Sequence, residues 1–295
     1  MDFFVVLIIE QKQRQFMTRL TALNAENFKM DGGACFGVVP KTIWGKYVPS
    51  DSENLIEMSS RCLLVEKNDK IILIDTGMGN KQSEKFFNNF HLFGGSHIEN
   101  ELEKKSYNND QITDVILTHL HFDHVGGAVK KMDDGTLKPT FPNATYHCSK
   151  LQWDWANNPN PREKASYFPE NFIPLSDAGQ LNLILKEGQF SDEIELRIFN
   201  GHTRGQIIPI IKYKDRKIVY AADFIPSVWN IPLAYVASFD IDPLCAMKEK
   251  ESFLKETFEN NYVLFFEHDY YHECCTVKMT EKGIKSDGFF RLDEI

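Results

Sequence analysis

The chain has 295 residues, of which 42% are hydrophobic and 25% charged, which is ordinary for a globular protein long enough to bury a sizeable core in one large domain or two small ones. Its formal net charge of −9, with no basic cluster, argues against nucleic acid as a partner, because binding to a phosphate backbone depends on Lys and Arg. The 6 cysteines are scattered without Cys-x-x-Cys spacing, which favours reduced thiols in a cytoplasmic protein and does not suggest a structural zinc site.

An apolar run from Phe3 to Ile9 opens the chain. It is shorter than the about 20 residues that a helix needs to span a bilayer, and no basic residue precedes it, so we expect neither a membrane anchor nor a secretory signal. The run is either an extra strand or part of an extension ahead of Met17. We favour the extension, residues 1–17, followed by one folded domain, residues 18–295.

The next hundred residues alternate loops, strands and a helix. Residues 31–60 are rich in Gly and Pro, which predicts loops with short strands and no helix. The β-rich runs 61–66 and 70–75 are separated by a short turn and predict a hairpin that ends at Asp75. Residues 81–105 are polar, with phenylalanines spaced for one face of a helix.

A cluster of three histidines and an aspartate follows the short apolar run 114–117, which predicts a buried strand. The cluster comprises His119, His121, Asp123 and His124. His119 and His121 point the same way if the backbone is extended, while the other two face a second point nearby. With only 9 histidines in the chain, this crowding indicates a site, and its geometry suits two metal ions better than one.

Two regions hold unusually many aromatic residues among loop signals, around residues 36–47 and 151–178. We expect a helical lid or a substrate wall from them, with filling of the core as the alternative. The six aromatic residues of this expected wall are Phe36, Trp44, Tyr47, Trp153, Trp155 and Phe168.

Two further histidines and an aspartate each follow a predicted strand in the second half of the chain. The run 195–199 leads to His202, a predicted hairpin over residues 207–221 leads to Asp223, and the run 262–266 leads to His268. His147, in another predicted strand, is expected to be structural. The pattern of strands and helices alone predicts an α/β protein with two layers or more.

The pattern His-x-His-x-Asp-His resembles the signature of the metallo-β-lactamase superfamily, in its dinuclear metallohydrolase branch. The later motifs Gly201-His202-Thr203, Ala222-Asp223 and Glu267-His268 occur in the order expected for that family, so the resemblance runs from about Arg61 to His268. It implies an αββα sandwich, in which two mixed β-sheets are flanked by helices and the metals lie at one edge.

The resemblance also implies a ligand set. His119, His121 and His202 would bind one metal, Asp123, His124 and His268 would bind the other, and Asp223 would bridge the two. Two Zn²⁺ per chain are expected, and Mn²⁺, Co²⁺ or Fe²⁺ also suit such ligands. A hydroxide between the metals would attack the substrate, so Asp223 and Asp123, which could pass a proton to the leaving group, are the catalytic candidates. Asp75 would orient a metal-bound histidine.

Within this branch the chain resembles quorum-quenching N-acyl-homoserine lactonases and methyl parathion hydrolase. His121, where redox relatives have Glu, favours hydrolysis, and Asp223 stands where some zinc β-lactamases have Cys. Pro226 occupies the position of a lactonase tyrosine. We expect a hydrolase that opens an ester or lactone with an apolar body, with N-acyl-homoserine lactones preferred. A phosphotriester hydrolase and a non-catalytic metal-binding protein are the alternatives, and a homodimer is a possible assembly.

Overall fold

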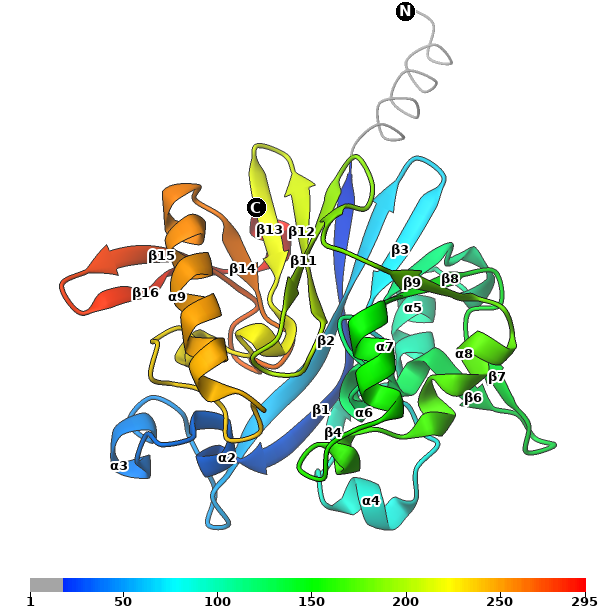
Figure 1. Cartoon of the computed structure of the whole chain (residues 1–295), viewed down its shortest axis with the longest axis horizontal. Coiled ribbons are helices and arrows are strands. Elements are labelled where there is room, and N and C mark those ends of the chain that lie inside the picture. The colour runs from blue at the N-terminus through cyan, green and yellow to red at the C-terminus, as the bar shows by residue number, and fades with distance from the viewer. Residues whose placement is uncertain (1–17) are drawn as a thin grey trace, which may run out of the picture.

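Two mixed β-sheets pack face to face in the computed structural model, which describes residues 18–295 (Figure 1). The expected extension, residues 1–17, lies outside the described residues. The first sheet has the strand order β4 (Phe93–Gly95), β1 (Arg19–Asp31), β2 (Leu55–Lys67), β3 (Lys70–Ile74), β5 (Asp114–Ile116), β8 (Thr145–Ser149), β9 (Leu181–Ile184). The second has the order β10 (Gly188–Gln189), β11 (Ile194–Phe199), β12 (Gln206–Tyr213), β13 (Arg216–Tyr220), β14 (Val263–Phe265), β15 (Cys274–Thr280), β16 (Gly283–Phe290).

Each sheet combines antiparallel hairpins with parallel pairs. Strands β2 and β3 form the predicted hairpin, and β3, β5, β8 and β9 run parallel to one another. In the second sheet, β13 and β14 are parallel and their neighbours are antiparallel. A small hairpin of β6 (Val129–Lys131) and β7 (Leu137–Pro139) stands apart from both sheets.

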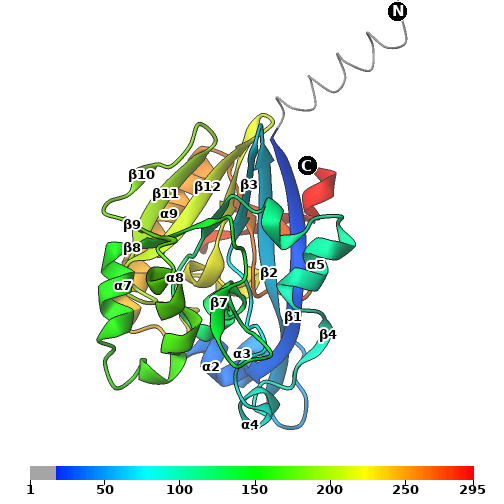
Figure 2. The ribbon, with the colours of Figure 1, turned by 90° about the vertical axis from the view of Figure 1, so that its right-hand side faces the viewer.

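Helices α5 (Ile98–Lys104), α7 (Lys150–Asn157) and α8 (Ile173–Asp177) cover the outer face of the first sheet, and α9 (Pro243–Glu259) covers that of the second (Figure 1, Figure 2). The short helices α2 (Gly32–Phe36), α3 (Lys41–Trp44) and α4 (Glu84–Asn88) lie at one end of the sandwich, and α6 (Phe122–Val125) follows β5. At the start of helix α9 the Asp242 side chain accepts a hydrogen bond from the amide of Cys245, and Pro243 occupies the first turn. None of the helices within residues 18–295 combines the length and the apolar content needed to cross a bilayer.

Alternating side chains of the central strands supply two separate cores. Along β2, Leu63 and Val65 face the second sheet, whereas Cys62 and Leu64 face the outer helices. Both faces of this strand are therefore buried, which explains its nearly continuous apolar sequence. The layered arrangement confirms the predicted αββα sandwich.

The loop-rich region 31–60 differs from its prediction because it contains two short helices. Asp31 caps α2 by accepting a hydrogen bond from the amide of Ala34, at 2.9 Å. Phe36 and Trp44, at the ends of α2 and α3, are almost fully buried against β1 and β2. Capping and tertiary packing thus stabilise helices too short for a periodic sequence pattern to reveal.

Candidate metal centre

The His119–His124 motif lies where β5 ends and the chain turns into the single-turn helix α6. Gly126 follows this helix, and a Cβ atom there would lie 1.8 Å from the carbonyl oxygen of Met78. Only glycine allows the chain to pack so closely against the loop that follows Asp75. The Gly-Gly pair after the motif therefore brings the histidines next to Asp75.

Seven side chains from the ends of four strands converge at one edge of the sandwich. One group comprises His119, His121, His202 and Asp223, and the other comprises Asp123, His124 and His268. Within each group the potential ligand atoms lie within 4.8 Å of one another. The structure thus gathers all seven of the candidate ligands into two adjacent groups.

Asp223 lies between the two groups and presents one oxygen to each. Its Oδ1 atom is 2.8 Å from Nε2 of His268, and its Oδ2 atom is 3.1 Å from Nε2 of His202. The preceding residue, Ala222, has a φ of 40° in the turn that carries Asp223. A non-glycine residue in this region stores backbone strain of about 1–3 kcal/mol, as often happens where a functional side chain must be aimed.

The donor set fits a cation. Nε2 of His119 and Oδ1 of Asp223 are buried and have no hydrogen-bond partner among the described residues, although Asp223 Oδ1 lies near His268. Burial opposes protonation of His202 and His268, but the charge of Asp223 outweighs it and raises their pKa to about 10 and about 9. Protons on these nitrogens take the place that a metal ion would occupy. Imidazole and carboxylate ligands suit zinc and other divalent transition metals.

Each imidazole is also held through its other nitrogen, which fixes the ring orientation. The partners are Thr118 Oγ1 for His119 (3.1 Å), Glu163 Oε1 for His121 (3.0 Å), Asp75 Oδ2 for His124 (3.1 Å), Asp240 Oδ1 for His202 (2.8 Å) and the Ser59 carbonyl for His268 (2.8 Å). As a result His121 turns Nδ1 toward the centre, whereas the other four histidines turn Nε2.

Glu163 joins the long segment after α7 to the centre. Its carboxylate accepts hydrogen bonds from Trp155 Nε1 at 2.7 Å and from the Tyr167 hydroxyl at 2.6 Å, in addition to its contact with His121. Burial raises the pKa of Glu163, but the hydrogen bond and charge of His121 outweigh it and lower the pKa to about 2. Trp155, expected to wall the site, instead supports this carboxylate.

His124 faces two buried carboxylates. Besides Asp75, Oε2 of Glu267 lies 3.0 Å from its Nδ1 atom. Burial, together with the nearby charge of Asp75, raises the pKa of Glu267 to about 8. Asp75 also accepts hydrogen bonds from the amide and hydroxyl of Thr118, at 2.8 and 2.6 Å, so it both caps this turn and orients His124.

A cavity of about 410 Å³ opens over the two groups. Its walls are mainly apolar side chains, namely Phe28 and Met30 of β1, Ala34 of α2, Met58 of β2, Phe122 of α6 and Phe239. Four polar residues complete the lining: Arg162, Glu163, Ser166 and Ser238.

None of the six aromatic residues of the expected wall lines this cavity. Phe36 and Trp44 are buried in the core, and Tyr47 is 58% exposed and stacks on Trp229. Trp153 packs on Phe172, while Trp155 bonds Glu163. Phe168 lies behind Phe122, with ring centroids 6.1 Å apart. Of these six, Trp155 and Phe168 contact the lining residues Glu163 and Phe122, and the other four lie farther from the cavity.

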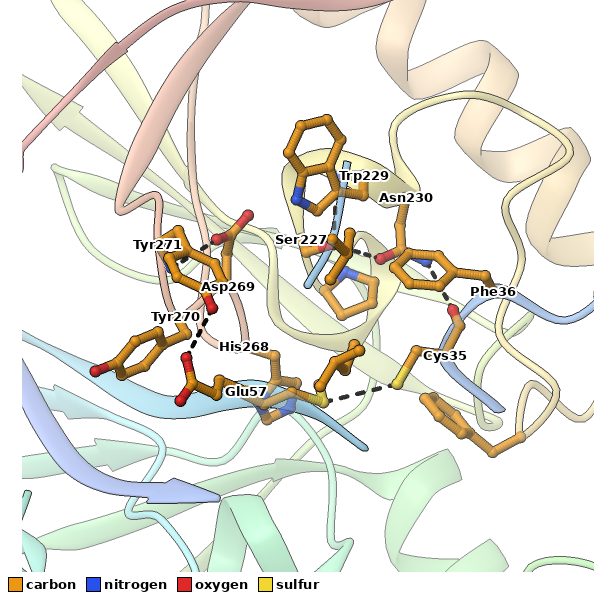
Figure 3. A pocket seen from close by; sticks show the side chains of 15 residues that line it. Cys35, Phe36, Glu57, Ser227, Trp229, Asn230, His268, Asp269, Tyr270 and Tyr271 are labelled. Carbon is orange, nitrogen blue, oxygen red and sulfur yellow. Dashed lines mark hydrogen bonds between the residues drawn. The ribbon is translucent and has the colours of Figure 1, made fainter. Parts of the chain in front are cut away.

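A second, smaller cavity lies behind His268 (Figure 3). Its volume of about 20 Å³ is enough for a single water molecule. Figure 3 shows Cys35, Phe36 and Asn230 on one side and Glu57, Tyr270 and Tyr271 on the other. Pro226, at the position where lactonases have a tyrosine, lines this cavity and not the larger one.

The sequence interpretation missed Glu163, Asp240 and Arg162. Asp240 stands two residues before the helix cap Asp242, and Glu163 lies in a Pro- and Asn-rich loop, so neither belongs to a periodic element. Their place at the centre depends on the path of long loops, which local patterns do not reveal. His147, by contrast, bonds Asp114 and Asn182 away from the centre, in keeping with a structural role.

Comparison with known proteins places these features in a family. A model described as the metallo-beta-lactamase superfamily matches residues 55–268. The N-acyl homoserine lactonase AiiA of Bacillus thuringiensis subsp. kurstaki is 24% identical over 236 residues, covering 73% of this chain and 83% of the relative. The N-acyl homoserine lactonase of Bacillus cereus is 25% identical over 237 residues, with the same coverage of 73% and 83%.

Solved structures share the fold. A probable metal-dependent hydrolase from Staphylococcus aureus superposes with a TM-score of 0.85 at 29% identity, covering 95% of this chain and 99% of that one. AidC, a dizinc quorum-quenching lactonase, superposes with a TM-score of 0.74 at 23% identity, covering 94% and 97% of the two chains. Since the family model matches most of the chain and the sandwich fold agrees with it, this chain belongs to the metallo-β-lactamase superfamily.

Proposed function

We propose that this protein is a dinuclear metal-dependent hydrolase that opens the ring of lactones, with N-acyl-homoserine lactones as the preferred class. The observation that carries the proposal is Asp223, whose two oxygens face two separate groups of ligands. Sequence similarity to N-acyl homoserine lactonases supports the choice of substrate class.

The metals would be held by the seven side chains in the two groups. His119, His121 and His202 hold one ion, Asp123, His124 and His268 hold the other, and Asp223 binds both. Two Zn²⁺ are proposed, and Mn²⁺, Co²⁺ or Fe²⁺ suit the same ligands. When bound, such a pair of ions lowers the pKa of a shared water to about 7 and so supplies a nucleophile at neutral pH.

The protein itself contributes orientation and proton transfer. Asp123 lines the cavity, and its Oδ2 atom lies 3.8 Å from Nε2 of both His124 and His268. A carboxylate in this place can take a proton from the attacking water and return it to the oxygen of the opened ring. The carboxylates of Asp75, Glu163 and Asp240 keep the imidazoles in one orientation throughout.

The cavity suits a neutral substrate with an apolar body. Phe28, Met30 and Phe122 offer apolar contact, and the metal centre provides the polar anchor. No tyrosine within residues 18–295 lines the cavity, so the oxyanion would depend on the metals. One oxyanion donor is worth about 10²–10³ in turnover, so slower catalysis is expected than with a tyrosine present.

The dinuclear proposal is tested by elemental analysis of purified, reconstituted protein. We expect about two transition-metal ions per chain, as a paired site requires. One ion or none would contradict the proposal, and two ions without hydrolysis of any ester would favour a non-catalytic metal-binding protein.

The substrate class is tested by specificity constants for acyl-homoserine lactones of increasing chain length and for paraoxon-type phosphotriesters, on zinc- and manganese-loaded protein. We expect lactones to be opened, with longer chains preferred. Turnover of phosphotriesters without turnover of lactones would overturn the choice of substrate.

A further inference from the structure

Arg162 occupies the mouth of the metal cavity. It lies in the turn between α7 and the 3-10 helix at Lys164–Ser166, and its side chain is exposed while lining the cavity. Its guanidinium donates a hydrogen bond to the carbonyl of Ser238, and the amide of Ser238 donates in turn to the carbonyl of Ala34 at 2.8 Å. Three segments that are distant in sequence therefore meet beside this side chain.

The charge of Arg162 is not neutralised by a neighbour. No carboxylate within residues 18–295 forms a salt bridge with it, and no other Lys or Arg lines the cavity. The adjacent carboxylate of Glu163 is already occupied by His121, Trp155 and Tyr167. An arginine that spans a cavity mouth without an acidic partner has charge and donors available for a ligand.

The guanidinium also has unused hydrogen-bond donors. Arginine carries five N–H groups, and one side-chain hydrogen bond, to Ser238, is formed among the described residues. Met30 and Phe239 line the cavity with apolar side chains, and the hydroxyls of Ser166 and Ser238, which also line it, are uncharged. Arg162 is thus the strongest polar feature of the cavity outside the metal centre and its carboxylates.

We propose that Arg162 determines specificity by donating a hydrogen bond to a second carbonyl of the substrate, outside the ester that reacts. This inference rests on the proposed lactonase function and assigns a residue to the recognition of its preferred class, lactones that carry an amide carbonyl next to the ring. A single guanidinium, already bound on one side to Ser238, matches one neutral acceptor between apolar walls. The metal centre would anchor the ester carbonyl while Arg162 binds the amide, so the substrate would be fixed at two points.

The test compares two lactones of similar apolar length, N-hexanoyl-homoserine lactone and a γ-alkyl lactone that lacks the amide. Arg162→Met should lower kcat/KM for the amide-bearing lactone by roughly 10- to 100-fold, as expected for a hydrogen bond to a charged group. The same variant should change kcat/KM for the alkyl lactone by less than about twofold, since no amide is present to lose its partner. Arg162→Lys, which keeps the charge but not the planar donor geometry, should fall between the two.

A matched control is Lys164→Met, which removes a nearby exposed cation that does not line the cavity. This variant should leave kcat/KM for both lactones unchanged, and metal content should be unchanged in every variant. If Arg162→Met slows both lactones equally, Arg162 only closes the cavity mouth and the inference fails while the lactonase function stands. If the wild-type protein opens neither lactone, the proposed function fails and the inference fails with it.

Discussion

The floor and the rim of the cavity are built in different ways. The floor consists of the seven candidate ligands, which are buried, follow the ends of strands, and in the case of each imidazole have a hydrogen-bond partner behind them. The rim consists of Met30, Phe122, Phe239 and Arg162, which come from loops, a strand end and a single-turn helix. The difference implies that the chemistry is determined by the sandwich itself, whereas substrate choice can change through side chains that the metal centre does not need.

The strongest test of the floor is Asp223→Ala. Because its two oxygens face both groups of ligands, the variant should lose metal and activity together. The loss of activity should exceed the about 10²–10³ that a single oxyanion donor contributes. Elemental analysis and kinetics on the same sample measure both effects. His147→Ala is the control and should change neither the metal content nor the activity. If Asp223→Ala retains two ions, the bridging role assigned to Asp223 is wrong.

A smaller effect is expected one layer behind the floor, at Glu163. Glu163→Gln keeps the size of the side chain but weakens its bond to Nε2 of His121. Loss of such a partner costs about 10- to 100-fold in metal affinity or activity. Titration of the metal-free protein with Zn²⁺ should show one weakened site and one unchanged site. Glu170→Gln, in the same segment without a contact to a candidate ligand, is the comparison, and equal affinities in the two variants would argue against an orienting role.

Substitutions in the rim should change the preference for the acyl-chain length of the substrate and leave the chemical step unchanged. Met30→Ala removes apolar surface from the cavity wall, and each buried methylene is worth about 0.8 kcal/mol. We expect KM to rise about tenfold for a long-chain lactone, with kcat for a short-chain lactone unchanged. Met279→Ala removes a methionine that is 52% exposed on β15, and it should change neither KM for the long-chain lactone nor kcat for the short-chain lactone. A uniform fall in kcat would mean that the rim and the floor are not separable.

The smallest effect concerns Lys250, which holds the loop that carries Phe239 and Asp240. Its Nζ atom donates to the carbonyls of Asn230, Pro232 and Tyr235, at 2.8, 3.1 and 3.1 Å. Burial lowers the pKa of Lys250 from 10.5 to about 8. Between these two values the unfolded chain binds a proton that the folded chain does not, so raising the pH stabilises the fold.

Denaturation of the wild type and of Lys250→Met at several pH values measures this contribution. The free energy of unfolding of the wild type, relative to the variant, should increase from about pH 8 to about pH 10.5, by at most about 1.4 kcal/mol per pH unit. Lys248→Met, which removes an exposed lysine of the same helix, should show no such trend. If the difference in the free energy of unfolding between the wild type and Lys250→Met does not depend on pH, folding does not lower the pKa of Lys250.

Local patterns predicted an α/β protein with two layers or more and polar residues at strand ends, whereas the resemblance to the metallo-β-lactamase superfamily implied the sandwich and the assignment of the ligands to two metals. Each candidate follows an apolar strand at a short distance, and strand ends meet at an edge of a sheet, so local patterns carry the information. The rim could not be predicted in this way. Phe36 and Trp44 look like wall residues in a Gly-rich segment, but short helices turn them into the core. Glu163 and Asp240 reach the histidines only because long loops fold back over the edge, and such paths depend on tertiary packing.

The two sheets also divide the chain at one point. All strands of the first sheet, and the β6–β7 hairpin, precede β10, where the second sheet begins. The first half carries His119, His121, Asp123 and His124, while His202, Asp223 and His268 belong to the second. Neither half alone possesses a complete set for either ion. During synthesis, the complete metal sites would therefore form only after the second sheet has folded and docked on the first. Metal binding would then stabilise the docked sheets and occur only in the fully assembled chain.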